Sequence, residues 1–263
     1  LNIVSDVKAS SKVTDDNTII YRGNAENDIV IKGVLPCNKE EFKIKGCIPN
    51  PPQYVTDKLY RKLVESGIPV SGGAVVTDKK YEAENERTEL HTVMSPSVIT
   101  IVNYANSVSC NLYAEILRLQ VMHKTGRDFA AYAAGYFDKR AIDSKGFFAV
   151  VGSGVSLSNA VTDKQTTQLL KYIKGSRFGE NFISGMAEAG KTGTLKSYKC
   201  CKDGQMKLKA KTGSMTRVRA LAGYITNKRG ENIVFCVLLE NYNAKSYRVR
   251  DLLDGLVREG GIQ

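Results

Sequence analysis

Residues 206–226 read MKLKAKTGSMTRVRALAGYIT, and their pattern gives a clear indication of the fold class. Apolar and polar residues alternate strictly over 206–211, which predicts a half-buried β-strand. Further strands are predicted over 220–226 and 233–239, and the polar residues 227–230 form a turn between them. Strands that follow one another through short turns predict an antiparallel meander.

Helical patterns flank this meander on both sides. A terminal helix is predicted from the helical spacing of Val249, Leu252, Leu253, Leu256 and Val257. Upstream helices are predicted over 53–66, 111–122 and 129–137, and from Thr162, where Gln165 completes a capping box. Helices followed by an antiparallel meander and a closing helix predict an α+β fold and argue against a doubly wound parallel sheet.

The first 48 residues have a different pattern. Short alternating apolar segments punctuated by glycines predict a β-rich segment over 1–48. Pro49-Asn50-Pro51-Pro52 then interrupts the alternation and fixes an extended backbone. We therefore expect a module boundary here, with a β-rich segment over 1–48 and a second domain over 49–263.

Composition excludes several classes of protein. The 263 residues are 42% hydrophobic, which argues against disorder, and no apolar run reaches the roughly 18 to 20 residues that a membrane helix needs. The 38 Lys and Arg against 27 Asp and Glu give a net charge of +11. These basic residues are spread along the chain, and the densest stretch, 196–211, has one aromatic residue, Tyr198. We expect no nucleic-acid partner.

The cysteines and histidines give no metal-binding pattern. The six cysteines form no C-x-x-C pair, and the chain has two histidines, so we expect neither a metal site nor a cofactor. Cys37 and Cys47 could bridge neighbouring strands, although spacing alone does not establish a disulfide. The number of cysteines leaves the redox compartment open.

The tripeptide Lys-Thr-Gly occurs twice, in different contexts. Residues 211–213 lie at the end of the alternating strand, where a Lys ammonium, a Thr hydroxyl and a close-approach glycine make an edge suited to a carboxylate. The N–H groups of such an edge can also pair with an extended peptide. Residues 191–193 follow a segment without strand alternation, so we expect a surface loop there.

Ser109-Cys110-Asn111 precedes the predicted helix over 111–122. Ser and Asn both cap helices well, so an ordinary helix cap is one interpretation. The other interpretation depends on the Lys-Thr-Gly about 100 residues later. Serine penicillin-binding proteins combine S-x-x-K, S-x-N and K-T-G, and residues 109–111 and 211–213 supply the last two.

Six ordered motifs extend this match over about residues 49–243, and the chain resembles the penicillin-binding protein 4 type of D-alanyl-D-alanine carboxypeptidase/endopeptidase. The motifs are Pro49-Asn50-Pro51-Pro52, His91 with Ser95-Pro96, Ser109-Cys110-Asn111-Leu112-Tyr113-Ala114-Glu115, Gly152-Ser153-Gly154-Val155-Ser156, Ala189-Gly190 with Gly193-Thr194-Leu195, and Lys211-Thr212-Gly213-Ser214 through Leu221-Ala222-Gly223-Tyr224. Two residues depart from the family pattern: Cys110 and Val151 stand where Asp is usual. The change at Val151 puts a polar role there in doubt, whereas Cys110 occupies the variable position of S-x-N.

The resemblance implies a transpeptidase/β-lactamase-like catalytic domain and serine acyl transfer on the D-Ala-D-Ala end of peptidoglycan stem peptides. It implies that Ser109 passes a proton to the leaving amine and that Asn111 holds the acyl-side amide. Lys211 and Thr212 of the Lys-Thr-Gly strand, which includes Gly213, would bind the terminal carboxylate, and the Ser214 N–H would form half of an oxyanion hole. It further implies inhibition by β-lactams and a periplasmic or cell-envelope location.

The expected nucleophile is the serine of S-x-x-K, and the chain offers one match, Ser5-Asp6-Val7-Lys8. We reject this match, because residues 9–17 have no helical apolar stripe that would hold Ser5 and only four residues precede it. We expect a C-terminal part of the catalytic domain without the S-x-x-K segment, inactive alone, with residues 1–48 as the tail of an inserted domain. The alternative is a non-catalytic peptidoglycan-binding or scaffold protein that begins near Leu1.

Overall fold

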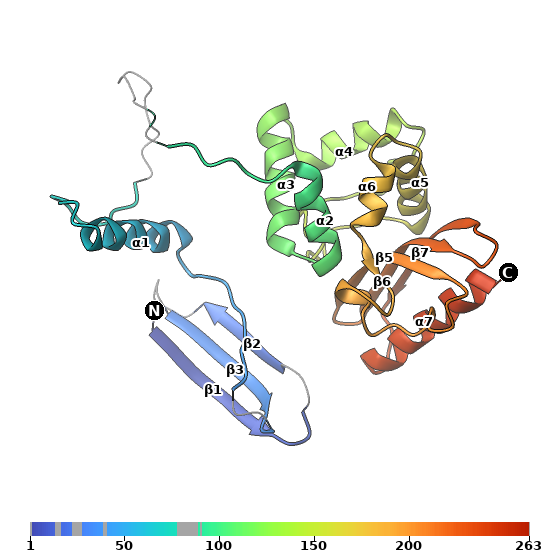
Figure 1. Ribbon diagram of the computed structural model, residues 1–263, viewed down its shortest axis with the longest axis horizontal. Coiled ribbons are helices and arrows are strands. Elements are labelled where there is room, and N and C mark those ends of the chain that lie inside the picture. Colours follow the sequence, from blue (N-terminus) through green and yellow to red (C-terminus); the bar gives the residue numbers. More distant parts are fainter. Residues whose placement is uncertain are drawn as a thin grey trace. The chain divides into compact units, whose positions relative to one another are not determined.

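The computed structural model describes residues 2–13, 17–22, 28–38, 41–77, 89 and 91–262 (Figure 1). The chain forms two compact units, Leu1–Leu90 and His91–Gln263. Within the described residues, no helix is both long enough and apolar enough to span a membrane.

The first unit contains a three-stranded sheet, as the β-rich pattern predicts. Strand β1 (Asn2–Ser10) runs parallel to β3 (Asp28–Pro36), and β2 (Asn17–Arg22) pairs antiparallel with the other edge of β3. Gly33 allows β2 to approach closely, because a Cβ there would lie 2.2 Å from the Asn17 carbonyl oxygen. β3 is therefore the central strand of this small sheet.

Helix α1 (Pro51–Glu65) also belongs to the first unit. The Asn50 side chain caps its N-terminus by accepting a hydrogen bond from the Gln53 N–H. Proline at the first helical position needs no N–H partner and has a helical φ, so the Pro-rich segment starts the helix. The compact units divide at residue 90, beyond this helix, whereas the domain boundary expected at residue 49 stays a prediction.

The second unit contains the predicted antiparallel meander. Its strands are β4 (Ala187–Glu188), β5 (Lys207–Met215), β6 (Val218–Thr226) and β7 (Asn232–Glu240), and each pairs antiparallel with the next in the order β4-β5-β6-β7. The polar turn expected at 227–230 joins β6 to β7.

Helices make up most of the remaining second unit. They are α2 (Val98–Val108), α3 (Asn111–Thr125), α4 (Phe129–Asp138), α5 (Asp163–Lys174), α6 (Gly179–Ser184), the 3₁₀ helix η1 (Gly193–Leu195) and α7 (Ser246–Ile262). The capping box expected at Thr162 and Gln165 is present at the start of α5. The α+β fold class predicted from the sequence is therefore confirmed.

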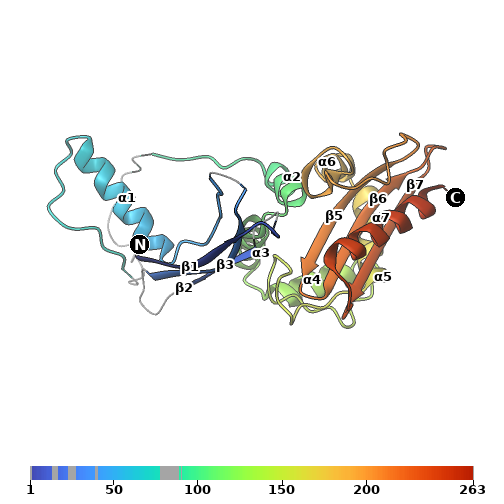
Figure 2. The same ribbon diagram turned by 90° about the horizontal axis from the view of Figure 1, so that it is seen from below.

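The core lies on both faces of the central strand β6. On one face, Leu221 and Ile225 pack in a buried cluster with Leu253 and Val257 of α7. On the other face, Tyr224 packs with α5 and donates a hydrogen bond of 2.8 Å to the Leu170 carbonyl. Figures 1 and 2 show α7 on one side of the strands and α5 and α6 on the other. Antiparallel pairing then places β5 next to this packed strand.

Candidate active site

The second Lys-Thr-Gly lies on β5, as predicted, where the outer edge of the sheet is open. Strand β4 pairs only with Lys209 and Ala210 of β5. Among the described residues, no strand pairs with residues 211–215 on that side. An open strand edge offers backbone N–H and C=O groups to an extended peptide. Lys211, Thr212 and Gly213 are thus placed along a possible binding edge.

Ser109 lies at the tight corner between α2 and α3. It has left-handed backbone angles, φ 59° and ψ 51°, and forms the C-cap of α2, while Cys110 is the N-cap of α3. This conformation costs a non-glycine residue roughly 1 to 2 kcal/mol. Backbone strain of this kind is often found at functional sites. Asn111 follows as the exposed first residue of α3.

The corner and the strand meet through Lys211. Its Nζ donates to Ser109 Oγ at 2.6 Å and to the Thr212 carbonyl at 2.5 Å, across 102 residues of sequence in the first case. Burial lowers the pKa of Lys211, because the charged ammonium loses water. S-x-N and K-T-G, which the sequence could connect only through a resemblance, are therefore in direct contact.

Thr212 makes a contact that the sequence did not indicate. Its Oγ1 donates to Thr194 Oγ1 of η1 at 2.9 Å. Gly193 brings η1 against α2, because its φ is +56° and a Cβ there would lie 2.1 Å from the Ser107 carbonyl oxygen. Thr194 belongs to one of the ordered motifs, so the motif could have identified this residue, but not its contact with Thr212.

Glu115 of α3 holds the Gly152–Ser156 segment in place. Its carboxylate accepts the Gly152 N–H at 2.7 Å and the Arg118 Nε–H at 2.7 Å. The hydrogen bond from Arg118 lowers the pKa of Glu115. Gly152 fits closely on α3, since a Cβ there would lie 2.6 Å from the Ala114 carbonyl oxygen. The motif at 109–115 and the motif at 152–156 are thus joined through the contacts of Glu115 and Gly152 with one another and with α3.

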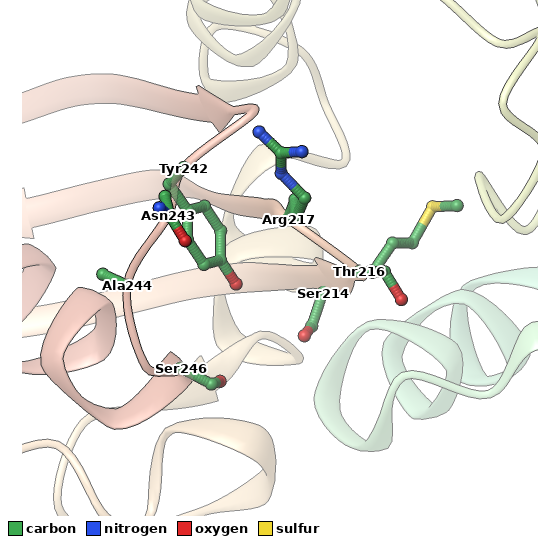
Figure 3. Close-up of a pocket in the computed structure, with 8 residues that line it drawn as sticks. Ser214, Thr216, Arg217, Tyr242, Asn243, Ala244 and Ser246 are labelled. Atoms are coloured by element: carbon green, nitrogen blue, oxygen red, sulfur yellow. The ribbon is translucent and has the colours of Figure 1, made fainter.

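A cavity of about 640 Å³ opens beyond the end of the Lys-Thr-Gly strand (Figure 3). It is lined by Ser214, Met215, Thr216, Arg217, Tyr242, Asn243, Ala244 and Ser246. The Arg219 guanidinium, opposite Ser214 on β6, donates to Ser246 Oγ, and Arg217 donates to the Asn241 carbonyl at 2.9 Å. The cavity thus lies between the β5–β6 turn and the segment that follows β7, and Ser214 of the Lys-Thr-Gly strand is part of its lining.

The first Lys-Thr-Gly, at 191–193, and the S-x-x-K match at 5–8 both lie outside the Ser109 and Lys211 contact. Residues 191 and 192 form an exposed turn, as expected, and Gly193 begins η1. Lys191 Nζ lies 2.6 Å from Glu188 Oε1. Ser5 and Lys8 lie within β1. Residues three apart on a strand point to opposite faces, whereas on a helix they share a face.

Within the part of the chain that the structure describes, no group of three or more His, Cys, Asp or Glu side chains is placed to hold a metal.

Comparisons with known proteins identify two curated relatives of the chain. The chain is 26% identical to the penicillin-sensitive carboxypeptidase A of Dictyostelium discoideum, over 80% of this chain and 42% of the relative. It is 24% identical to the D-alanyl-D-alanine carboxypeptidase DacB of Haemophilus influenzae, over 82% of this chain and 46% of the relative. The chain thus spans less than half of the length of these relatives.

The fold is also similar to a solved structure. Penicillin-binding protein 4 of Haemophilus influenzae, in complex with a β-lactam, matches with a TM-score of 0.77 and 20% identity, over 100% of this chain and 64% of that one. The family model of the D-Ala-D-Ala carboxypeptidase 3 (S13) family matches residues 2–259. The chain therefore belongs to the D-Ala-D-Ala carboxypeptidase 3 (S13) family.

Proposed function

We propose that this chain supplies the carboxylate-binding and proton-transfer part of a serine D-Ala-D-Ala carboxypeptidase that acts on peptidoglycan stem peptides. The observation that carries the proposal is the 2.6 Å contact between Lys211 Nζ and Ser109 Oγ beside an open strand edge. A cation and a hydroxyl held together at such an edge can bind a peptide carboxylate and move a proton. Family membership supports the same reaction class.

In this proposal, an extended peptide lies along β5 with its terminal carboxylate on Lys211 and Thr212. Ser109 passes a proton to the leaving D-Ala amine, since its hydroxyl is already hydrogen-bonded to the Lys211 ammonium. The Ser214 N–H stabilises the oxyanion, and Asn111 holds the acyl-side amide. The acyl-enzyme then reacts with water. An endopeptidase reaction on cross-linked peptides would use the same groups.

The nucleophile is assigned to no residue of this chain. Activation of Ser5 would require Lys8 Nζ beside its hydroxyl, and their positions on β1 point the two side chains to opposite faces. We infer that a serine outside residues 1–263 attacks the substrate, and that this chain alone neither hydrolyses D-Ala-D-Ala nor becomes acylated.

Inhibition by β-lactams and a cell-envelope location complete the proposal. A relative from Dictyostelium discoideum is named penicillin-sensitive, and the similar Haemophilus influenzae structure contains a β-lactam. A β-lactam presents a carboxylate beside a strained amide, so Lys211 and Thr212 would bind it as they bind the peptide. An enzyme that acts on peptidoglycan works where peptidoglycan is, in the envelope.

Acylation by penicillin tests the position of the nucleophile. The 263-residue chain is incubated with benzylpenicillin, and its intact mass is measured. We expect no acyl adduct, because Ser5 and Lys8 lie three residues apart on β1, which points their side chains to opposite faces. A stoichiometric adduct mapped to Ser5 by peptide mass spectrometry would show that the nucleophile is in this chain.

D-Ala release tests the reaction itself, on the protein as its gene encodes it. We expect release of the terminal D-Ala from an acyl-D-Ala-D-Ala peptide, and a loss of about a hundredfold or more in Ser109→Ala, which removes the proton path. Lys209→Met, two residues before Lys211, serves as the control with activity unchanged. The alternative is a non-catalytic scaffold protein, which would bind peptidoglycan and release no D-Ala. An S-x-x-K sequence encoded ahead of residue 1 would argue against this alternative.

A further inference from the structure

Cys200 and Cys201 form a pair of thiols outside the candidate active site. They are neighbours in the turn between η1 and β5, and their Sγ atoms lie 3.6 Å apart. Cys200 is 3% exposed, and Cys201 is half-buried. All six cysteines are free thiols, including exposed Cys37 and Cys47, so no disulfide links these last two.

The surroundings of the pair distinguish its two sulfur atoms. The contact between the two thiols raises the pKa of Cys200 and lowers that of Cys201. The Leu208 N–H also favours the Cys201 thiolate, and Lys191 interacts with its charge. The carboxylates of Asp203 and Asp254 act against it. Cys201 is thus both the more exposed residue of the pair and the one whose thiol is more easily ionised.

The turn that carries the pair is fixed to α7. The Asp254 carboxylate accepts the N–H groups of Lys199, at 3.0 and 3.1 Å, and of Cys200, at 2.9 Å. Cys200 also belongs to the buried cluster between the sheet and α7. The fold therefore holds the backbone of this turn and buries the Cys200 side chain beside Cys201.

We propose that Cys200 and Cys201 are a thiol–disulfide exchange site for low-molecular-weight disulfides. The Cys201 thiolate attacks one sulfur of the disulfide RS–SR, forms a mixed disulfide and releases RS⁻. Cys200 then loses its proton to the released thiolate and attacks the Cys201 sulfur, which releases the second RS⁻. The pair is oxidised to a vicinal disulfide, and RS–SR is reduced to two thiols once the second thiolate takes up the proton that Cys201 lost.

The bond formed in this way is readily reversed. Neighbouring Cα atoms across a trans peptide lie about 3.8 Å apart, and disulfides usually need about 4.4 to 6.8 Å between Cα atoms. The vicinal ring is therefore strained, and strained disulfides are more easily reduced. This favours an exchange site over a structural cross-link.

The test follows each cysteine separately. The reduced chain is treated with oxidised glutathione, the remaining thiols are alkylated with iodoacetamide, and tryptic peptides are analysed by mass. We expect residues 200 and 201 to lose two hydrogen atoms and to carry neither glutathione nor alkyl group. The lone thiols of Cys37 and Cys47 should keep glutathione. In Cys200→Ser, Cys201 should keep one glutathione, because no neighbouring thiol displaces it. Glutathione retained on Cys201 of the unsubstituted chain, or two free thiols there, would overturn the proposal.

A second measurement needs no variant that must fold. Phenylarsine oxide condenses with two adjacent thiols and releases water, and it binds single thiols far less stably. We expect it to protect Cys200 and Cys201 of the unsubstituted chain from alkylation while Cys37 and Cys47 react. Equal alkylation of all four would contradict a paired site.

Discussion

Lys211 carries a positive charge in a place where folding disfavours charge. Its two hydrogen-bond acceptors are neutral oxygen atoms, of Ser109 and Thr212, and burial lowers its pKa. A buried cation without a nearby anion reduces the free energy of unfolding. A substrate carboxylate would supply that anion, so the cost in stability is consistent with a binding role.

Replacing this lysine with an apolar side chain of similar length should therefore stabilise the protein. We predict that Lys211→Met raises the free energy of unfolding at pH 7, measured by urea denaturation. Between the lowered pKa and the ordinary value of 10.5, the unfolded state binds more protons than the folded state, so the stability of the unsubstituted chain rises with pH. The advantage of Lys211→Met should then shrink toward pH 10. Destabilisation at pH 7, with Lys209→Met as control, would contradict this account.

The left-handed conformation of Ser109 separates backbone strain from hydroxyl chemistry. Glycine adopts φ near 59° without a steric cost, whereas alanine keeps the strain. We predict that Ser109→Gly is more stable than Ser109→Ala by about 1 kcal/mol in urea denaturation. Both variants should lose the proton transfer equally, because both lack the hydroxyl. Equal stabilities would show that residue 109 leaves the left-handed region.

At the scale of the elements, η1 is positioned by Gly193. Alanine there needs a positive φ and would bring a Cβ within 2.1 Å of the Ser107 carbonyl oxygen. We predict that Gly193→Ala lowers the free energy of unfolding by about 2 kcal/mol or more, because the backbone of η1 or of α2 must move to relieve the contact. Gly204 is the matched control, with φ +72° and no heavy atom within 4 Å of the Cβ position. Gly204→Ala should cost about 1 kcal/mol, from φ alone. If Gly193→Ala and Gly204→Ala lowered the free energy of unfolding equally, in thermal or urea unfolding, the close contact at Gly193 would be contradicted.

Strand β5 and helix α5 were predictable from the sequence, whereas helix α2 was not. Strict alternation over 206–211 identified β5, and the capping box at Thr162 and Gln165 identified the start of α5, because both signals are local. Helix α2 was missed, because its sequence VITIVNYANSV is rich in β-branched residues that favour strands. Its packing against α3, α6 and η1 overrides that preference.

The candidate site could be predicted only in part. The residue types at 109–111 and 211–213 were identified through ordered motifs, but sequence spacing does not give the contact between Ser109 and Lys211. The contact of Thr212 with Thr194 and the hold of Glu115 on Gly152 depend on tertiary packing and have no local signal. The vicinal pair Cys200 and Cys201 is visible in the sequence, whereas the different burial of its two thiols is not.

At the scale of the whole molecule, the candidate site lies within one compact unit. Ser109, Lys211 and Thr194 all belong to His91–Gln263, while Ser5 lies in Leu1–Leu90. The matched region covers 42% and 46% of two curated relatives, so much of the length of those relatives lies outside it. Our proposal is therefore that this chain binds the carboxylate and that the nucleophile lies outside residues 1–263.

Recognition of the substrate carboxylate by Lys211 can be measured on this chain alone. The chain is titrated with N-acyl-D-Ala-D-Ala and with the same peptide as its C-terminal amide, and binding is followed by NMR chemical shifts. We predict saturable binding of the free acid, weaker binding of the amide, and loss of the preference in Lys211→Met but not in Lys209→Met. Equal binding of acid and amide, or a preference that survives Lys211→Met, would contradict our proposal.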